Sequence, residues 1–382
     1  MVEAENRDFS DKPFSGVLIF LKDLGQEQAG EPSTAGSRLF TSYHAKETDN
    51  YVKKLEELGF IILGRSSTPE FGFKNISDAQ IHGPVNLPGD VRRNAGGSSG
   101  GAAAIVSSGL SPLAPASDGG GSIRIPASFN GLIGLKPTRG RIPVGPGSFR
   151  GWQGASVQFA LTKTVRDTKR LLYHMQTCQM EGPFILPKLD KDSLGQPVRP
   201  LKIAFLTVSP IGGKVSESAI AATKKAARAL ESLGHHVHEI THQPLNGIEA
   251  MQSYYIMNSV ETAAMFDGIE AGLGRQMTLE DMELMTWVIF QSGQKIPAKV
   301  YSKILAQWDL YSYQMAVFHE AYDILLTPTV ADVAPKHGQF ALSESLQNQL
   351  KHMSEFDWPK QQELIWLSLI HISEPTRRSY IS

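Results

Sequence analysis

Two glycine-rich segments carry serine residues at a spacing that suggests chemistry. One reads Gly96-Gly97-Ser98-Ser99-Gly100-Gly101; the other, Asp118-Gly119-Gly120-Gly121-Ser122, places its serine 24 residues after Ser98. Glycine has no Cβ, so the backbone can approach a small group closely and several N–H groups can surround an anion. A serine beside such donors can act as a nucleophile at an oxyanion hole, although a serine in a glycine-rich turn is more often only a turn residue. We therefore predict Ser122 as the nucleophile, with the N–H groups of Gly119, Gly120, Gly121 and Ser122 as the oxyanion hole.

These motifs resemble the amidase signature family, and the resemblance covers nearly the whole chain. The other matching segments are Gly16–Asp23, Gly64–Gly72, Pro126–Phe129, Gly134–Thr138 and Leu325–Thr329. The resemblance implies an α/β amidase signature fold, with a central mixed β-sheet covered by helices on both faces. It also implies a Ser–cisSer–Lys triad. In this sequence the triad falls on Ser122, Ser98 and Lys22, which lies 76 residues before Ser98.

The resemblance also assigns a role to each of these side chains. Ser98, in a cis peptide after Gly97, passes the proton of Ser122 to a neutral Lys22. Burial at the end of an apolar strand lowers the pKa of a lysine, as this role requires. Asp118 and Arg124 are expected to brace the nucleophile turn, although a simple local ion pair is the alternative. Ser99 is expected to hold the loop.

The predicted reaction is hydrolysis of a carboxylic acid amide, outside a peptide backbone, through an acyl-Ser122 intermediate (EC 3.5.1 type). The expected partner is a small-molecule amide, with no metal and no organic cofactor. Within the family, the glutaminase-type A subunit of a transfer-RNA amidotransferase is an alternative, because it also releases ammonia from an amide. An inactive fragment or binding scaffold that retains the fold is a further alternative.

Three other motif readings are weaker. Gly96 to Gly100 fits the G-x-S-x-G elbow of α/β-hydrolases, which would make Ser98 the nucleophile, but the preceding residues 88–95 are charged and turn-like and predict no strand. A phosphate-binding loop would need Gly-Lys-Ser/Thr after the glycines. The histidines at 235, 236, 238 and 242 lack a carboxylate or cysteine at metal-ligand spacing, so we expect His236 and His238 on a solvated strand face.

Composition sets broad limits on the class of protein. The 382 residues are 41% hydrophobic, and 37 basic residues balance 38 acidic ones without a run of one sign. This balance predicts a globular protein that binds neither nucleic acid nor an anionic membrane. A single cysteine, Cys178, suits a reducing compartment, and the apolar runs are too short to cross a bilayer. We expect a cytoplasmic enzyme; a homodimer is compatible with the sequence.

Secondary-structure patterns place the motifs in an alternating α/β chain. Strands are predicted at 16–21, 60–63, 202–206 and 237–240; helices are predicted after Asp49, at 165–175 leading away from the core, at 216–233, and over most of 246–319. Lys22 directly follows the predicted strand at 16–21. Residues 146–154 are predicted to form a loop. This alternation predicts an α/β sheet.

The two ends depart from the family pattern. Residues 367–382 resemble a translated sequencing adapter, so we expect an amidase domain over residues 1–366 and a non-native tail after it. Family members continue with an Asn-x-x-Gly-x-Pro-Ala segment, and they carry several dozen helical residues before the lysine strand. We therefore expect the domain to be incomplete at both ends.

Overall fold

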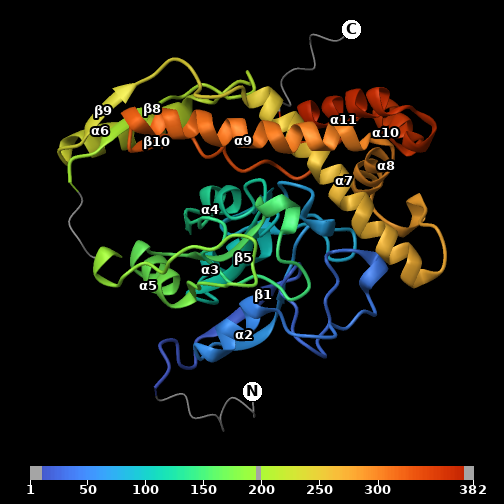
Figure 1. The fold of residues 1–382 in the computed structure, drawn as a ribbon, viewed down its shortest axis with the longest axis horizontal. Coiled ribbons are helices and arrows are strands. Elements are labelled where there is room, and N and C mark those ends of the chain that lie inside the picture. The colour runs from blue at the N-terminus through green and yellow to red at the C-terminus, as the bar shows by residue number, and fades with distance from the viewer. Residues whose placement is uncertain (1–10, 195–198, 374–382) are drawn as a thin grey trace. The chain divides into compact units, whose positions relative to one another are not determined.

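The computed structural model describes residues 11–194 and 199–373, apart from the side chains of 193 and 369–373. The chain divides into two compact units: residues 1–196 with 334–337, and residues 197–333 with 338–382. Figure 1 shows the course of the chain through the elements of both units. The predicted boundary at residue 366 falls within the last helix, α11 (Trp358–Ser373), and it stays a prediction.

The first unit is a mixed α/β structure around the two serine motifs. Its elements are β1 (Leu18–Lys22), α2 (Asn50–Glu57), β2 (Ile61–Ser66), β3 (Asn86–Leu87), β4 (Asp90–Asn94), α3 (Gly100–Ser108), β5 (Leu113–Asp118), α4 (Arg124–Asn130), β6 (Ile133–Gly134), β7 (Val157–Thr162) and α5 (Val165–Met175), with short 3-10 helices at 38–40, 70–72, 151–154 and 192–194. Strands β1 and β2 pair in parallel. Strand β7 pairs antiparallel with both β5 and β6.

The core of the first unit lies between these strands and the helices on them. Helix α3 packs on β1, β2, β5 and β7 with its small side chains Ala102, Ala103 and Val106, which are fully buried. Small residues let the helix approach the strands closely, which brings its N-terminus, just after Ser98 and Ser99, to the end of β1. Strand β5 is buried along its whole length. The motif that contains Ser98 leads into α3, and the motif that contains Ser122 follows β5, so each adjoins a buried element.

The second unit has its own parallel sheet and a group of long helices. Strand β8 (Lys202–Phe205) lies between β10 (Ile324–Leu326) and β9 (His236–Glu239), all parallel. The helices are α6 (Glu217–Ser232), α7 (Gly247–Leu273), α8 (Leu284–Lys295), α9 (Ala298–Ala321), α10 (Glu344–Lys351) and α11, with 3-10 helices at 279–281 and 353–355. In the residues described, no helix is long and apolar enough to span a membrane.

Several predicted elements are confirmed, and three expectations are wrong. Helix α5 spans the predicted residues, but it does not lead away from the core, since Leu171 and Met175 are fully buried in it. Residues 90–94 form strand β4, where a turn was predicted. Its partners are β3 on one side and residues 334–337 on the other, where Asn94 N–H donates to the Pro335 carbonyl at 2.9 Å. Asp49 precedes α2 but does not cap it, because its carboxylate accepts the Glu27 N–H instead.

The strands of the described chain form four separate hydrogen-bonded sheets, two of two strands and two of three. Within the first unit, β1 lies against β5, and the two are linked by the Ser111 hydroxyl, which donates to the Leu18 carbonyl at 2.7 Å. This contact sets the end of β1, with Lys22, beside the end of β5, with Asp118.

Candidate active site

Lys22 is the last residue of β1, and its side chain is fully buried. Its Nζ lies 2.7 Å from Ser98 Oγ. Desolvation by burial lowers the pKa of Lys22 from 10.5 to about 7, against the opposing effect of the Asp118 carboxylate. A neutral amine is thus accessible near neutral pH, which is what a general base at this position needs.

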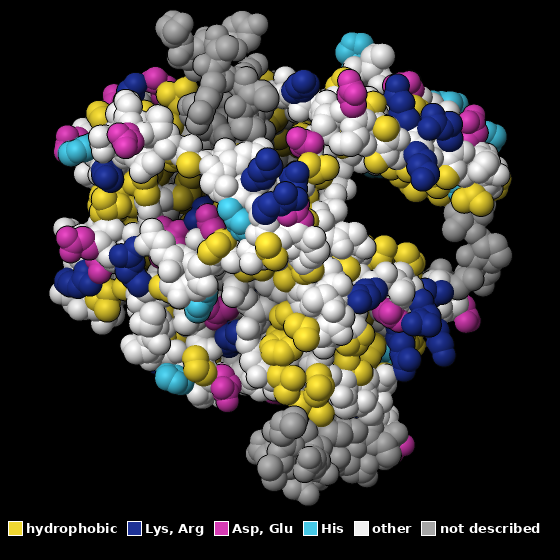
Figure 2. Space-filling view, turned by 180° about the vertical axis from the view of Figure 1, so that it is seen from behind, with side chains coloured by type: hydrophobic (Ala, Val, Ile, Leu, Met, Phe, Trp, Pro, Cys, Tyr) yellow, Lys and Arg dark blue, Asp and Glu magenta, His cyan; other side chains and the backbone are white. Residues whose placement is uncertain are grey.

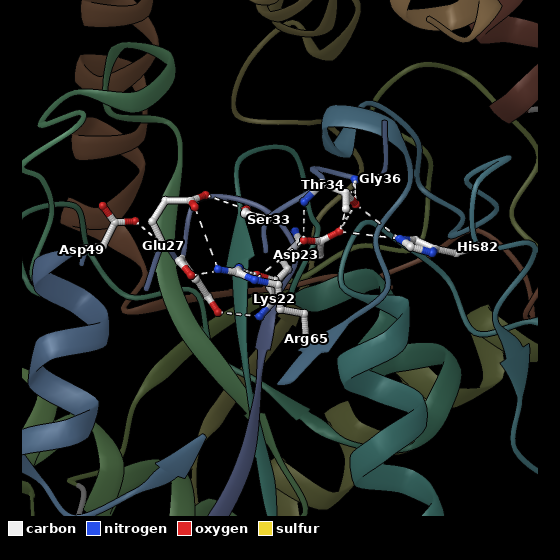
Figure 3. Close-up of polar contacts among 10 residues, drawn as sticks. Lys22, Asp23, Glu27, Ser33, Thr34, Gly36, Asp49, Arg65 and His82 are labelled. Atoms are coloured by element: carbon white, nitrogen blue, oxygen red, sulfur yellow. Dashed lines mark hydrogen bonds and ion pairs between the residues drawn. The ribbon is translucent and has the colours of Figure 1, made fainter. Parts of the chain in front are cut away.

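A polar network fixes the backbone on either side of Lys22 (Figure 3). Arg65 of β2 donates through Nη1 to the carbonyl oxygens of Lys22 at 3.2 Å and Gln26 at 3.0 Å. The Gln26 side-chain carbonyl accepts the Lys22 N–H at 2.6 Å, and Asp23 accepts the Thr34 N–H at 2.9 Å. The network holds the end of the strand, so the long Lys22 side chain starts from a fixed point.

A cavity of about 690 Å³ lies along β2, lined by Asp23, Thr34, Arg65 and His82 among others. Its lining includes every residue from 60 to 67 along β2, together with Leu21 and Asp23. Lys22, Ser98 and Ser122 do not line it.

Ser98 lies in the turn before α3 and is almost fully buried. The peptide bond between Gly97 and Ser98 is cis, as the resemblance implied. The flanking glycines are packed against neighbouring backbone: a Cβ on Gly97 would lie 2.7 Å from Ile76 N, and one on Gly101 would lie 2.4 Å from Ser67 N. These contacts leave no room for a side chain at either position, so the path of this turn depends on glycine.

Asp118 organises the turn that carries Ser122. Its carboxylate is fully buried and accepts the Arg124 Nε–H at 2.9 Å and the Nη2–H at 2.8 Å, together with the N–H groups of Gly121, Ile123 and Arg124. Burial alone would raise the pKa of Asp118, but Arg124 and these N–H groups hold it below its ordinary value. The arrangement is a hydrogen-bonded brace around the turn, beyond a simple surface ion pair.

This brace corrects one part of the predicted oxyanion hole. The Gly121 N–H donates to Asp118 Oδ1 at 2.8 Å, so it points at the carboxylate and not at a shared anion position. In the part of the chain that the structure describes, the N–H groups of Gly119, Gly120 and Ser122 donate to no other protein group. Gly119 also lies under the Trp152 indole, since a Cβ there would be 2.6 Å from Trp152 Cε3.

Ser117, which the sequence does not single out, also contacts Lys22, and Ser99 binds the backbone of Ser117. Lys22 Nζ lies 2.9 Å from Ser117 Oγ. The fully buried Ser99 hydroxyl donates to the Ser117 carbonyl at 3.2 Å and accepts the Ser117 N–H at 3.4 Å. Ser99 therefore ties its turn to the end of β5. A hydroxyl directly before Asp118 was the only sequence signal for Ser117, and serine is too common for that signal to single it out.

The arrangement can support base-assisted attack by a serine. The structure brings Lys22, Ser98 and Ser117 into direct hydrogen bonds, and it links the Ser98 and Ser122 turns through a 3.3 Å bond from the Ser99 N–H to the Ser122 carbonyl. The strand–turn–helix order required for a hydrolase elbow is present after all, through β4 and α3. However, Ser98 Oγ is directed at a buried lysine, as a relay would be.

The histidines at 235, 236, 238 and 242 belong to the second unit. His236 and His238 are on β9 with exposed side chains, as predicted. Across residues 11–194 and 199–373, no group of three or more His, Cys, Asp and Glu side chains is arranged to hold a metal ion. On the face of the molecule in Figure 2, basic and acidic side chains occur in small interspersed groups.

Comparison with known proteins identifies the relatives of this chain. The amidase family profile matches residues 2–360. Lipoamidase from Enterococcus faecalis is 35% identical over 366 residues, which make up 96% of this chain and 48% of that protein. The chain thus spans about half the length of that relative.

A second relative and a solved structure carry the same enzyme name. The 6-aminohexanoate-cyclic-dimer hydrolase from Paenarthrobacter ureafaciens is 29% identical over 346 residues, 88% of this chain and 70% of that enzyme. The structure of 6-aminohexanoate cyclic dimer hydrolase complexed with substrate superposes with a TM-score of 0.84 at 27% identity, covering 97% of this chain and 78% of that one. This similarity confirms the predicted α/β fold class.

Proposed function

The chain belongs to the amidase family, and from this premise we propose that it hydrolyses a carboxylic acid amide through an acyl-Ser122 intermediate. The observation that carries the proposal is the buried contact between Lys22 Nζ and Ser98 Oγ at 2.7 Å, with the pKa of Lys22 lowered to about 7. A lysine desolvated to this degree can act as a base at neutral pH.

Two proton transfers activate the nucleophile. Ser122 attacks the amide carbonyl carbon while its proton passes to Ser98, and the Ser98 proton passes to the Lys22 amine. Collapse of the tetrahedral intermediate breaks the C–N bond. The proton then returns from Lys22 through Ser98 to the leaving amine. Water hydrolyses the acyl-Ser122 ester with the same base, which leaves the carboxylic acid and the enzyme in its starting state.

The glycine turn before Ser122 supplies the electrostatic part of the mechanism. The N–H groups of Gly119, Gly120 and Ser122 have no other protein acceptor in the described structure, so they are available to the oxyanion. Asp118 does not contact the substrate in this proposal. It holds the turn by accepting the Gly121 N–H and binding Arg124. The Gly121 N–H thus helps to hold the Ser122 turn through its bond to Asp118.

The relatives suggest which amides to test first. Their names describe one lipoamidase and two hydrolases of 6-aminohexanoate cyclic dimer. We propose a small amide outside a peptide backbone as the substrate class and 6-aminohexanoate cyclic dimer as the first compound to test.

The test is covalent labelling of the intact protein with a fluorophosphonate, followed by mass spectrometry of the intact chain and its peptides. We expect one label, on Ser122, in the wild type, no label in Ser122→Ala, and at least tenfold slower labelling in Ser98→Ala. Ser108→Ala, which changes an exposed serine on α3, is the matched control and should label at the wild-type rate.

Two outcomes would contradict the proposal. A label on Ser98 that persists in Ser122→Ala would assign the nucleophile to Ser98 and favour the elbow. A folded wild type that takes no label at Ser122 would favour the inactive scaffold.

A further inference from the structure

Ser117 occupies a position that the three-residue mechanism does not use. It lies in β5, one residue before Asp118, and its hydroxyl oxygen is 2.9 Å from Lys22 Nζ. Across the described parts of the chain, Ser98 and Ser117 are the hydrogen-bond partners of this amine. The side chain is nearly buried, with 7% of the residue exposed, so water competes little for its place.

The geometry of a neutral amine explains why Lys22 needs the second contact, with Ser117. A neutral amine has two N–H donors and one lone pair. To accept the Ser98 proton, Lys22 Nζ must direct its lone pair at Ser98 Oγ, and then neither N–H can point there. One N–H needs another acceptor, or the amine rotates freely about its Cε–Nζ bond. The Ser117 hydroxyl is that acceptor at hydrogen-bond distance.

We propose that Ser117 is a positioning residue, whose hydroxyl accepts an N–H of Lys22 and so keeps the amine lone pair directed at Ser98. This inference rests on the proposed function, because it concerns the same base. Ser117 touches neither substrate nor reacting atoms; it acts through Lys22.

The surroundings of Ser117 fix it well enough for this role. Its N–H and carbonyl are both bonded to the Ser99 hydroxyl, at 3.4 and 3.2 Å, and Ser99 adjoins Ser98 in the chain. The two hydroxyl partners of the lysine are therefore held at a fixed spacing by one buried residue, Ser99. Ser117 is also paired with Gln158 across the β5–β7 ladder, which fixes its position along the strand.

The charged groups around the Lys22 amine affect its pKa and therefore the pH dependence of the labelling rate. Asp118 at the end of β5 is the charge that acts on Lys22, and it raises the lysine pKa. Asp23 directly follows β1 and accepts the Thr34 N–H. Arg65 of β2 donates to the Lys22 carbonyl, and α3 has no titratable residue. Protonated Lys22 donates to Ser117 more strongly than the neutral amine does. Removing the Ser117 acceptor must then favour the neutral form.

The experiment compares Ser117→Val with Ser117→Thr, which have the same shape and differ only in the hydroxyl. Both suit a strand. The readout is the rate of fluorophosphonate labelling of Ser122 from pH 5 to pH 9. In the wild type the rate should fall as the pH drops through about 7, the pKa of Lys22. We expect Ser117→Thr to reproduce this profile. Ser117→Val should label tenfold or more slowly on the plateau, with its acid limb moved to lower pH by about half a unit or more.

The outcomes separate this inference from the proposed function. If the wild type labels at Ser122 and Ser117→Val matches Ser117→Thr, the positioning role is refuted and the nucleophile assignment stands. A uniform loss of rate with an unmoved acid limb would also refute it, since a purely structural role predicts that result. If circular dichroism shows that neither Ser117→Val nor Ser117→Thr folds, Ser117→Ala is compared with the wild type for the same two quantities, the plateau labelling rate and the position of the acid limb. Failure of the wild type to label refutes the proposed function itself.

Discussion

Replacing Lys22 with methionine should make the protein more stable while it abolishes labelling of Ser122. The pKa of Lys22 falls from 10.5 to about 7 on folding because burial desolvates the ammonium. The folded state therefore binds fewer protons than the unfolded state between about pH 7 and pH 10.5. Since the unfolded chain holds the extra proton, this lysine destabilises the fold most fully below pH 7, and the penalty disappears as the pH rises toward 10.5.

The magnitude follows from the two pKa values. Linkage gives a penalty of about 4 to 5 kcal/mol at pH 6 and about 2 kcal/mol at pH 9. Methionine keeps the apolar part of the side chain, but it leaves the Ser98 and Ser117 hydroxyls without their nitrogen partner, at about 1 kcal/mol each. At pH 6 the Lys22→Met variant should thus be more stable than the wild type by about 2 to 3 kcal/mol, and this difference should shrink by about 2.5 kcal/mol between pH 6 and pH 9.

The assay is urea unfolding, followed by circular dichroism, of wild type and Lys22→Met at pH 6, 7.5 and 9. The comparison between the two proteins cancels every other titrating group. Lys169→Met, which makes the same change at an exposed lysine on α5, is the matched control. If the Lys22→Met difference stays constant within about 0.5 kcal/mol across this range, the lysine is not the desolvated base that the proposal requires.

Further substitutions test the turn that carries the nucleophile. Asp118→Asn should lower the free energy of unfolding by about 2 to 4 kcal/mol in urea titrations, because the amide nitrogen would face N–H donors in place of an acceptor. A loss below about 0.5 kcal/mol would show that the brace with Arg124 contributes little. Gly119→Ala would place a Cβ 2.6 Å from the Trp152 ring, so we expect a loss of about 1 to 3 kcal/mol and slower labelling. Gly147→Ala, where no atom lies within 4 Å of the new Cβ, is its matched control and should change stability by less than about 0.5 kcal/mol.

Local patterns were sufficient to predict the elements that depend on local physics. The apolar run before Lys22 is a strand in which Ile19 and Leu21 are buried and Leu18 is exposed. The periodic segment from Val165 to Met175 is a helix with the predicted bounds. Strand β4 could not be predicted in this way. Its five residues are mostly polar, and its pairing with residues 334–337 joins segments about 240 positions apart in the chain.

The same distinction applies to the site. Motif spacing pointed to Lys22, Ser98 and Ser122, and the structure places the first two in contact. The direction of the Gly121 N–H could not be read from a glycine-rich motif, because it depends on where the Asp118 carboxylate lies. Ser117 was missed for a similar reason. Its importance comes from a contact with a residue 95 positions earlier, which nothing in its neighbours indicates.

The tight packing of Gly97 and Gly101 against backbone affects how the sequence can diverge. Any side chain at either position would collide with residues 67 or 76, whether or not the protein has activity. Selection for folding alone would therefore preserve these glycines in a descendant that had lost Ser122 or Lys22. The glycine-rich motif marks ancestry and architecture, whereas only the lysine and the serines would distinguish a working hydrolase from a pseudoenzyme.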